Sequence, residues 1–276
     1  MRVLIEHAPA KINLALHVRA RRADGYHQIE TLFAFLTRGD TVRLENSTSS
    51  RFRVTGPFAH TLAREANNLV LAAREAFAAR FGPLPPLDIT LEKHLPVASG
   101  IGGGSADAAA TLRALARLKG IDIAKLRAIA LSLGSDVPAC LLGGSAIGHG
   151  RGEDLRPVVG LAGVPVLLVN PAVALSTADV FRAWDSVDRG PLPSGGVFEI
   201  ARTGRNDLEA PARMLAPIIG DVLDALRAQS GVDVARMSGS GATCFALFAD
   251  EQARAVAHRA ISAAHPGWWC FESALS

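Results

Sequence analysis

A glycine-dense segment that runs directly into an alanine-rich stretch constrains this chain more than any other feature. Residues 96–112 read PVASGIGGGSADAAATL. The four glycines allow backbone turns that other residues avoid, and they leave no side chain between the amide N–H groups and a ligand. The stretch from about Ser105 to Leu118 predicts a helix, whose N-terminus attracts anions. The segment therefore predicts a loop that binds a polyphosphate.

This segment differs from the two commonest phosphate-binding loops. No Lys follows its glycines, although the Walker pattern ends in Gly-Lys-Ser/Thr. The dinucleotide pattern G-x-G-x-x-G, started at Gly100, meets Ser105 where its last glycine should stand. A glycine-rich turn that merely begins a helix is the structural alternative, so residues elsewhere must decide between the two.

Length, charge and cysteine usage favour a two-domain cytoplasmic protein. The chain has 276 residues, 49% of them hydrophobic, which is near the size at which one core divides into two. Its net charge is only +3 and its basic residues are dispersed, so a nucleic-acid partner is not demanded. Cys140, Cys244 and Cys270 form no C-x-x-C pair, which predicts buried thiols in a reducing compartment. The sequence shows no signal peptide and no apolar run near the roughly 20 residues of a membrane span.

Strand and helix patterns alternate without one continuous doubly wound series, which predicts an α+β fold. The glycine- and proline-rich stretch between residues 148 and 165 predicts a domain boundary, with domains at residues 1–158 and 159–276. Strands are expected at residues 2–7, 10–18, 32–36, 41–46 (after a turn at 38–40), 51–55, 87–91, 164–169, 234–237, 243–248 and 268–272. Helices are expected at residues 69–77, 105–118, 123–133, from 136 to 142, 177–184, within 206–228 and at 251–264.

Two pairs of polar or aromatic residues near the N-terminus are candidates for a site. In residues 10–18 every second residue is apolar, so Lys11 and Asn13 point to the same face. A following turn carries Tyr26, the chain's only tyrosine, and His27. A flat ring beside a hydrogen-bonding ring suits a nucleobase, and a turn without a ligand is the alternative.

Five motifs follow one another across most of the chain, from about residue 8 to residue 250. They are PAKINLAL at 9–16, RADGYH at 22–27, GGGSADAA at 102–109, GSDVP at 134–138 and MSGSGAT at 237–243. In this order they make the chain resemble the GHMP kinases, the superfamily of galactokinase, homoserine kinase and mevalonate kinase. Within that superfamily, they are most similar to the branch that acts on a cytidine-linked alcohol.

The resemblance implies a fold and an activity. The fold would be the two-domain GHMP kinase fold, with a ribosomal protein S5 domain 2-like N-terminal domain and a ferredoxin-like C-terminal domain. The activity would be ATP-dependent phosphorylation of the 2-hydroxyl of a cytidine-diphosphate-linked methylerythritol, in non-mevalonate isoprenoid precursor biosynthesis. ATP and Mg²⁺ are the implied cofactors, and the partner would be this small molecule rather than nucleic acid or a membrane. No carboxylate is singled out as a metal ligand, and the oligomeric state is left open.

The resemblance also assigns the catalytic groups. Transfer of a phosphoryl group to an alcohol requires that both reactants be positioned, that phosphoryl charge be neutralised and that the hydroxyl proton be accepted. The proton would go to Asp136, which follows Gly134 and Ser135 at the start of a short helix. Lys11 would keep Asp136 ionised and stabilise the developing charge. The alternatives are a helix-capping Asp136 and a surface Lys11.

The remaining site residues divide between the two substrates. His27 would read the polar edge of the cytosine while Tyr26 and Phe181 stack on its faces. From the residues alone, Phe33 and Phe181 could equally be ordinary core residues. Lys93 would then be a solvated surface residue. Residues implied around the cytidine substrate are Asn13, Tyr26, His27, Phe33, Thr177 and Phe181. Residues implied around ATP are Pro96, Val97, Ala98, Ser99, Gly100, Ile101, Gly102, Gly103, Gly104, Ser105 and Ala106, with Asn68 and Lys93 beside the adenosine. Asp107 stands where many relatives carry Asn.

Two other functions stay open at this point. A GHMP kinase for a simpler alcohol, such as homoserine or mevalonate, would share the glycine loop but would offer no base to Tyr26 and His27. An RNA-binding module is conceivable because the first domain shares its fold with a ribosomal-protein domain, but it gives Asp136 no role. The turn at residues 239–241 is either a tight hairpin or a further contact to the phosphates or the substrate.

Overall fold

The structure is a computed structural model that describes residues 3–62 and 68–276. It contains two compact units, each assembled from separate stretches of the chain. Unit 1 comprises residues 1–10, 38–97 and 102–143, and unit 2 comprises residues 11–37, 98–101 and 144–276. Two long strands, β1 (Val3–Arg21) and β2 (His27–Asn46), contribute to both units. The division at residue 158 stays a prediction.

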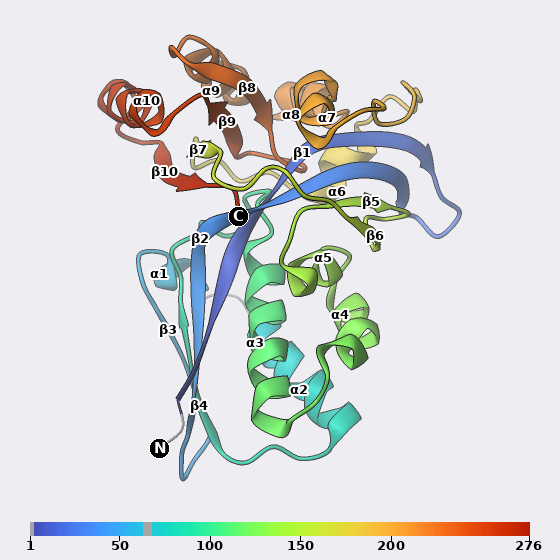
Figure 1. Ribbon diagram of the computed structural model, residues 1–276, viewed down its shortest axis with the longest axis vertical. Helices are drawn as coiled ribbons and strands as arrows, with labels where there is room; N and C mark the ends of the chain where they lie inside the picture. Colours follow the sequence, from blue (N-terminus) through green and yellow to red (C-terminus); the bar gives the residue numbers. More distant parts are fainter. Residues whose placement is uncertain (1–2, 63–67) are drawn as a thin grey trace. The chain divides into compact units, whose positions relative to one another are not determined.

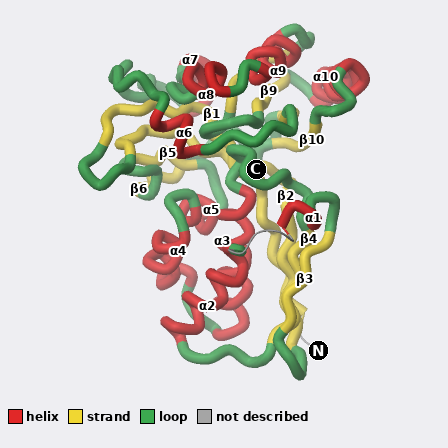
Figure 2. Tube along the Cα trace, turned by 180° about the vertical axis from the view of Figure 1, so that it is seen from behind, coloured by secondary structure: helices red, strands yellow, loops and turns green. Residues whose placement is uncertain are grey.

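Unit 1 is a sheet with helices along one side of it (Figures 1 and 2). Its elements besides β1 and β2 are β3 (Arg51–Thr55), α1 (Ala59–Leu62), α2 (Leu69–Phe81), β4 (Leu87–Glu92), α3 (Gly103–Lys119), the 3-10 turn η1 (Ile123–Leu126), α4 (Arg127–Leu133) and α5 (Val137–Leu142). β4 pairs antiparallel with the end of β2 and parallel with β3. α3 packs against α2 and α5 and buries ten residues, six of them alanines, whose small side chains let the neighbouring helices approach closely.

Unit 2 is built on a four-stranded antiparallel sheet in the order β10-β7-β9-β8, against which α9 and α10 pack (Figure 1). The bounds are β7 (Pro165–Asn170), β8 (Val232–Met237), β9 (Cys244–Phe248), β10 (Trp269–Ala274), α9 (Ile218–Arg227) and α10 (Glu251–Ala264). A hairpin of β5 (Ala146–His149) and β6 (Asp154–Pro157) pairs with the first half of β2. Three short helices complete the unit: α6 (Thr177–Arg182), α7 (Val197–Thr203) and α8 (Glu209–Leu215). Every residue of β7 and β9 is buried, so the core of unit 2 lies on this sheet.

Most elements with a capping signal in the sequence are confirmed. The Asn68 side chain accepts a hydrogen bond from the Val70 N–H, and α2 ends before Gly82, which has a φ of 87°. α10 has its predicted bounds, with Asp250 accepting from the Ala253 N–H. The mixture of helices with two separate sheets confirms the α+β class.

The structure corrects four expectations. β1 and β2 are each continuous, so the turn at 38–40 is wrong: a Cβ on Gly39 would lie 2.1 Å from the Ala8 carbonyl oxygen, and this glycine therefore permits a close approach of β1 to β2. α3 begins at Gly103 rather than Ser105, which puts two glycines of the loop in its first turn. The glycines and prolines of residues 148–165 predict an irregular segment, but it contains β6 and the end of β5, and no helix was expected at the position of α7.

Candidate active site

The first half of the glycine loop is held within unit 2 by β1 and by the turn at residues 238–241. The Lys11 N–H donates to the Ile101 carbonyl at 2.9 Å, and the Ser238 hydroxyl donates to the Gly100 carbonyl at 2.9 Å. Gly100 has a φ of 78°, and a Cβ there would lie 2.6 Å from the carbonyl oxygens of both Ser238 and Gly241. Only glycine fits this contact. The turn predicted as a possible second contact therefore packs directly on the loop.

Lys11 and Asn13 share a face of β1, as their spacing predicts. The Lys11 ammonium donates to the Asn13 side-chain oxygen at 3.0 Å and lies 5.3 Å from the centre of the Phe33 ring. The Asn13 amide donates to the Thr31 hydroxyl at 2.8 Å, and the Asn13 N–H donates to the Ser238 hydroxyl at 3.2 Å. Lys11 is only 3% exposed, so the surface alternative is wrong. Phe33 is buried beneath Lys11, as the interpretation of Phe33 as an ordinary core residue requires.

Two of the predicted base-binding residues, His27 and Phe181, meet in an aromatic group of unit 2 that also contains Trp184. The His27 ring lies 4.8 Å from the Phe181 ring and 5.7 Å from the Trp184 ring, measured between centroids. Burial and the nearby Arg21 charge lower the pKa of His27, which favours the neutral ring. Its Nε2 atom is buried and, among the described residues, has no hydrogen-bond partner. Tyr26 is half exposed, with the Arg151 guanidinium 4.6 Å from its ring centre.

Two further contacts fix the 238–241 turn relative to α6 and α8. The Thr177 hydroxyl at the start of α6 is 2.8 Å from the Ser240 hydroxyl. The Asn206 side chain, just before α8, donates to the carbonyls of Met237 and Gly239, both at 2.8 Å. These bonds connect a predicted substrate residue to the turn that supports the glycine loop.

In unit 1, Lys93 is the centre of a buried charged triad. Its ammonium lies 2.5 Å from the Asp40 carboxylate and 2.7 Å from the Asp107 carboxylate, and the residue is 1% exposed, so the solvated alternative is wrong. A Cβ on Gly103 would lie 3.0 Å from the Lys93 Nζ, which places the ammonium against the first turn of α3. Asp40 also accepts hydrogen bonds from the N–H groups of two residues that lead to the loop, His94 and Leu95.

The triad carries more negative than positive charge. Burial lowers the pKa of Lys93, but the adjacent Asp107 and Asp40 raise it by more, so the ammonium stays charged. Burial raises the pKa of Asp107 to about 7, with Lys93 opposing the rise and Asp40 adding to it. A proton on Asp107 would leave one ammonium facing one carboxylate, which is the cheaper arrangement in a low-dielectric interior.

Asp136 occupies the N-cap position of α5, directly before Val137 and Pro138. Its side chain makes no capping hydrogen bond to the first turn of that helix, all of which lies in the described part of the chain. Asp136 is half-buried, and the helix-capping alternative loses its support. Ser105 lies on the first turn of α3 and is also half-buried.

Sequence reasoning missed several polar partners of these residues. Ser238 lies inside a motif that the sequence singled out, and that motif was its only signal. Thr31 and Asp40 carry no local signal, because each acquires its role from a partner 18 or more residues away.

Comparisons with known proteins agree with the motifs. A family model described as GHMP kinases N terminal domain matches residues 68–144, and one described as GHMP kinases C terminal matches residues 196–267. A protein of Rhizorhabdus wittichii, named 4-diphosphocytidyl-2-C-methyl-D-erythritol kinase, is 54% identical over 98% of this chain and 94% of its own. The chain belongs to the GHMP kinase family. A Brucella melitensis protein of the same name is 49% identical, covering 96% of this chain and 93% of its own.

Solved structures place the GHMP kinase fold across the whole chain. A crystal structure of 4-(cytidine 5'-diphospho)-2C-methyl-D-erythritol kinase matches with a TM-score of 0.83 and 35% identity over 99% of both chains. A homoserine kinase of Cytophaga hutchinsonii matches with a TM-score of 0.70 and 21% identity over 96% and 95% of the two chains, which shows a shared fold. The expected two-domain GHMP kinase fold is thus confirmed, and ATP as phosphoryl donor is consistent with this kinase family. In the part of the chain that the structure describes, we find no helix with the length and apolar character of a membrane span.

Proposed function

We propose that this chain phosphorylates the 2-hydroxyl of 4-diphosphocytidyl-2-C-methyl-D-erythritol with ATP, giving the 2-phosphate and ADP. The observation that carries the proposal is the 54% identity, over nearly the full chain, to a protein that bears the name of that kinase. The aromatic group of unit 2 supports the choice of substrate. The buried Nε2 of His27, beside the Phe181 ring, has no hydrogen-bond partner within residues 3–62 and 68–276, and this suits a base more than the small alcohols homoserine or mevalonate.

In this proposal the glycine loop and the N-terminus of α3 hold the ATP phosphates. The loop residues Pro96 to Ala106 supply backbone N–H groups, and the helix adds its positive end. Asn68 remains a predicted neighbour of the adenosine. Because Lys93 commits its ammonium to two carboxylates under Gly103, we assign it the role of positioning the first turn of α3.

Asp136 and Lys11 are the proposed catalytic residues. The Asp136 carboxylate takes the proton of the 2-hydroxyl, the oxygen forms a bond to the γ-phosphorus, and the bond from that phosphorus to the ADP oxygen breaks. Lys11 stabilises the negative charge that develops on the transferring group. Its burial beside Asn13 and Phe33 strengthens this electrostatic effect, because water screens it less.

Mg²⁺ would enter with ATP. Among the described residues, no group of three or more His, Cys, Asp or Glu side chains is arranged to hold a metal ion. This fits Mg²⁺ as it is used with nucleotides, where one or two protein ligands join the phosphates. The half-buried Ser105 hydroxyl on the first turn of α3 is the side chain we propose to reach it. The ion would neutralise charge on the phosphates.

The test supplies the purified protein with ATP, Mg²⁺ and one alcohol at a time, and records ADP release. We expect turnover with the cytidine substrate and none with homoserine or mevalonate. Asp136→Asn should still bind ATP and substrate in a titration but lose about 10²- to 10⁴-fold in kcat. Turnover with homoserine or mevalonate alone would contradict the substrate, and wild-type kcat in Asp136→Asn would remove Asp136 as the base. RNA retention in moderate salt without ATP-dependent thermal stabilisation would favour the RNA-binding alternative.

A further inference from the structure

The last residue of β1 holds the backbone that carries two rings of the aromatic group. The Nη2 atom of Arg21 donates to the carbonyls of Arg182 and Trp184, at 3.0 Å and 2.9 Å. These carbonyls lie at the C-terminal end of α6, where the last carbonyls of a helix have no partner within it. The Phe181 and Trp184 rings both contact the His27 ring. One guanidinium therefore bonds to the backbone directly beside both rings.

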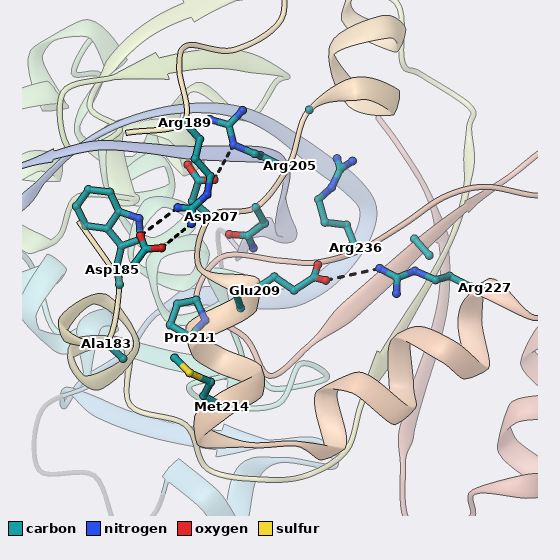
Figure 3. A pocket seen from close by; sticks show the side chains of 15 residues that line it. Ala183, Asp185, Arg189, Arg205, Asp207, Glu209, Pro211, Met214, Arg227 and Arg236 are labelled. Atoms are coloured by element: carbon teal, nitrogen blue, oxygen red, sulfur yellow. Dashed lines mark hydrogen bonds and ion pairs between the residues drawn. The ribbon is translucent and has the colours of Figure 1, made fainter. Parts of the chain in front are cut away.

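The end of α6 borders a pocket, so packing surrounds it incompletely. The helix is six residues long and buries Val180, and Trp184, just beyond it, is also buried. Ala183 and Asp185, however, lie in the wall of a pocket of about 440 Å³ (Figure 3). Asp185 pairs with Arg189 at 2.5 Å within the same exposed segment, so this pair does not attach the segment to another element. The bonds from the end of β1 therefore help to fix the position of this end of α6.

The charge of Arg21 also acts on His27. Burial lowers the pKa of the His27 ring, and the Arg21 charge lowers it further, which favours the neutral ring. On α6, Asp179 and Arg182 pair with each other at 2.5 Å, so their fields at the ring largely cancel. Arg21 itself is exposed, and water therefore screens its charge. The hydrogen bonds from Arg21 to the end of α6 are thus its larger contribution.

We propose that Arg21 is a positioning residue for recognition of the base, because it holds the two rings at the end of α6 against His27. The inference rests on the proposed function, in which the base lies beside His27 and Phe181. Rings that are fixed before the base arrives reduce the entropy that binding must remove. Without Arg21, the carbonyls of Arg182 and Trp184 would turn to water, and the end of α6 would be ordered only when the base binds.

Arg19 provides a matched control on the same strand. Its Nε donates to the Asp188 carboxylate at 2.8 Å, and its Nη1 lies 2.5 Å from the Glu30 carboxylate. Asp188 lies further along the chain than the end of α6. Arg19→Met therefore removes an arginine and two ion pairs from β1 but leaves the bonds from Arg21 to α6 in place.

The test measures binding of cytidine diphosphate by calorimetry, with the protein saturated by a non-hydrolysable ATP analogue so that the glycine loop is occupied. We expect Arg21→Met to weaken this binding about three- to tenfold, since two hydrogen bonds that order the rings are lost. Arg19→Met should leave it within about twofold. Affinity for the ATP analogue, measured alone, should be the same in all three proteins. In steady state, the KM for the cytidine substrate should rise in Arg21→Met with little change in kcat.

A double-mutant cycle tests whether Arg21 acts through the rings. Phe181→Leu keeps an apolar side chain but removes one ring that Arg21 positions. In that background, Arg21→Met should weaken binding of cytidine diphosphate by a smaller factor than it does alone, because coupled residues are not additive. Factors that multiply would show that Arg21 acts apart from Phe181 and would overturn the proposal.

The remaining outcomes separate this role from the proposed function. Equal affinity for cytidine diphosphate in wild type and Arg21→Met would overturn the role of Arg21 alone. An equal loss of affinity for the ATP analogue would show a general loss of structure and would also overturn it. No binding of cytidine diphosphate by the wild type would contradict the cytidine substrate itself, and with it the role of Arg21. The thermal midpoint of Arg21→Met should stay near that of the wild type, because Arg21 is exposed.

Discussion

The two most deeply buried lysines of the described chain have different surroundings, and the difference separates a structural from a reactive role. Lys93, in unit 1, is held by the carboxylates of Asp40 and Asp107 beneath the first turn of α3. Lys11, in unit 2, donates to the amide oxygen of Asn13 and lies over the Phe33 ring. A cation fixed between two carboxylates stabilises the fold around it. Lys11 instead contacts Asn13 and Phe33, two residues that the resemblance places around the substrate, where its charge would act on the reacting groups.

The largest expected effect concerns the stability of unit 1. Lys93→Met would leave Asp40 and Asp107 buried without their cation, and removal of one partner from a buried ion pair costs about 3–5 kcal/mol. We expect the free energy of unfolding in urea at neutral pH to fall by that amount. Lys125→Met, at an exposed lysine, should change it little. An equally stable Lys93→Met would show that the triad does not support the fold.

The next effect concerns catalysis and not stability. Lys11→Met should lower kcat by about 10²- to 10³-fold, because the developing charge loses its cation. The midpoint of thermal unfolding should stay near that of the wild type, since Met fills the space beside Phe33. Steady-state kinetics and a melting curve on the same preparation check both statements. A variant that keeps kcat but melts early would give Lys11 the structural role that we assign to Lys93.

A smaller effect depends on pH. The folded pKa of Asp107 is about 7, above its ordinary value, so the folded protein binds more protons than the unfolded chain between those values. The contribution of Asp107 to stability is therefore complete at acid pH and is lost as the pH rises through about 7. Asp107→Asn removes this loss, and its stability relative to wild type should rise by on the order of 2 kcal/mol from roughly pH 5 to pH 8. The measurement is the free energy of unfolding in urea at each pH. If its difference between Asp107→Asn and wild type did not change with pH, the raised pKa of Asp107 would be contradicted.

The smallest effect tests recognition of the base. His27→Phe keeps a ring against Phe181 and Trp184 but removes the hydrogen-bonding Nε2. We expect the KM for the cytidine substrate to rise about three- to tenfold with little change in kcat, because the lost bond contributes equally to substrate and transition state. The KM for ATP should not change. A rise in the ATP KM instead would place His27 at the nucleotide donor.

Local signals in the sequence predicted those elements whose ends are determined by nearby residues. Asn68 and Gly82 bound α2, and the alternation around Lys11 placed it beside Asn13. Gly39 was misread, because a glycine that permits a crossing strand looks the same in sequence as a glycine in a turn. The difference depends on Ala8, which approaches it only in the folded chain.

Contacts between distant residues could not be predicted in the same way. Lys93 reads as a surface residue until Asp40, 53 positions earlier, is folded against it. Ser238 connects Asn13 to Gly100, although 225 positions separate it from Asn13. The roles of Asp136, Tyr26 and Phe181 came from the resemblance, and they stay predictions for the variants to test.

The most direct test of the account identifies the phosphorylated hydroxyl. The wild-type protein is incubated with ATP, Mg²⁺ and 4-diphosphocytidyl-2-C-methyl-D-erythritol, and the product is examined by phosphorus NMR. A phosphate on the tertiary 2-hydroxyl has no proton on its carbinol carbon, so we predict a new phosphomonoester signal without three-bond proton coupling, formed in equal amount with ADP. A coupled signal would place the phosphate on another hydroxyl, and ADP without any new phosphomonoester would contradict the proposed reaction itself.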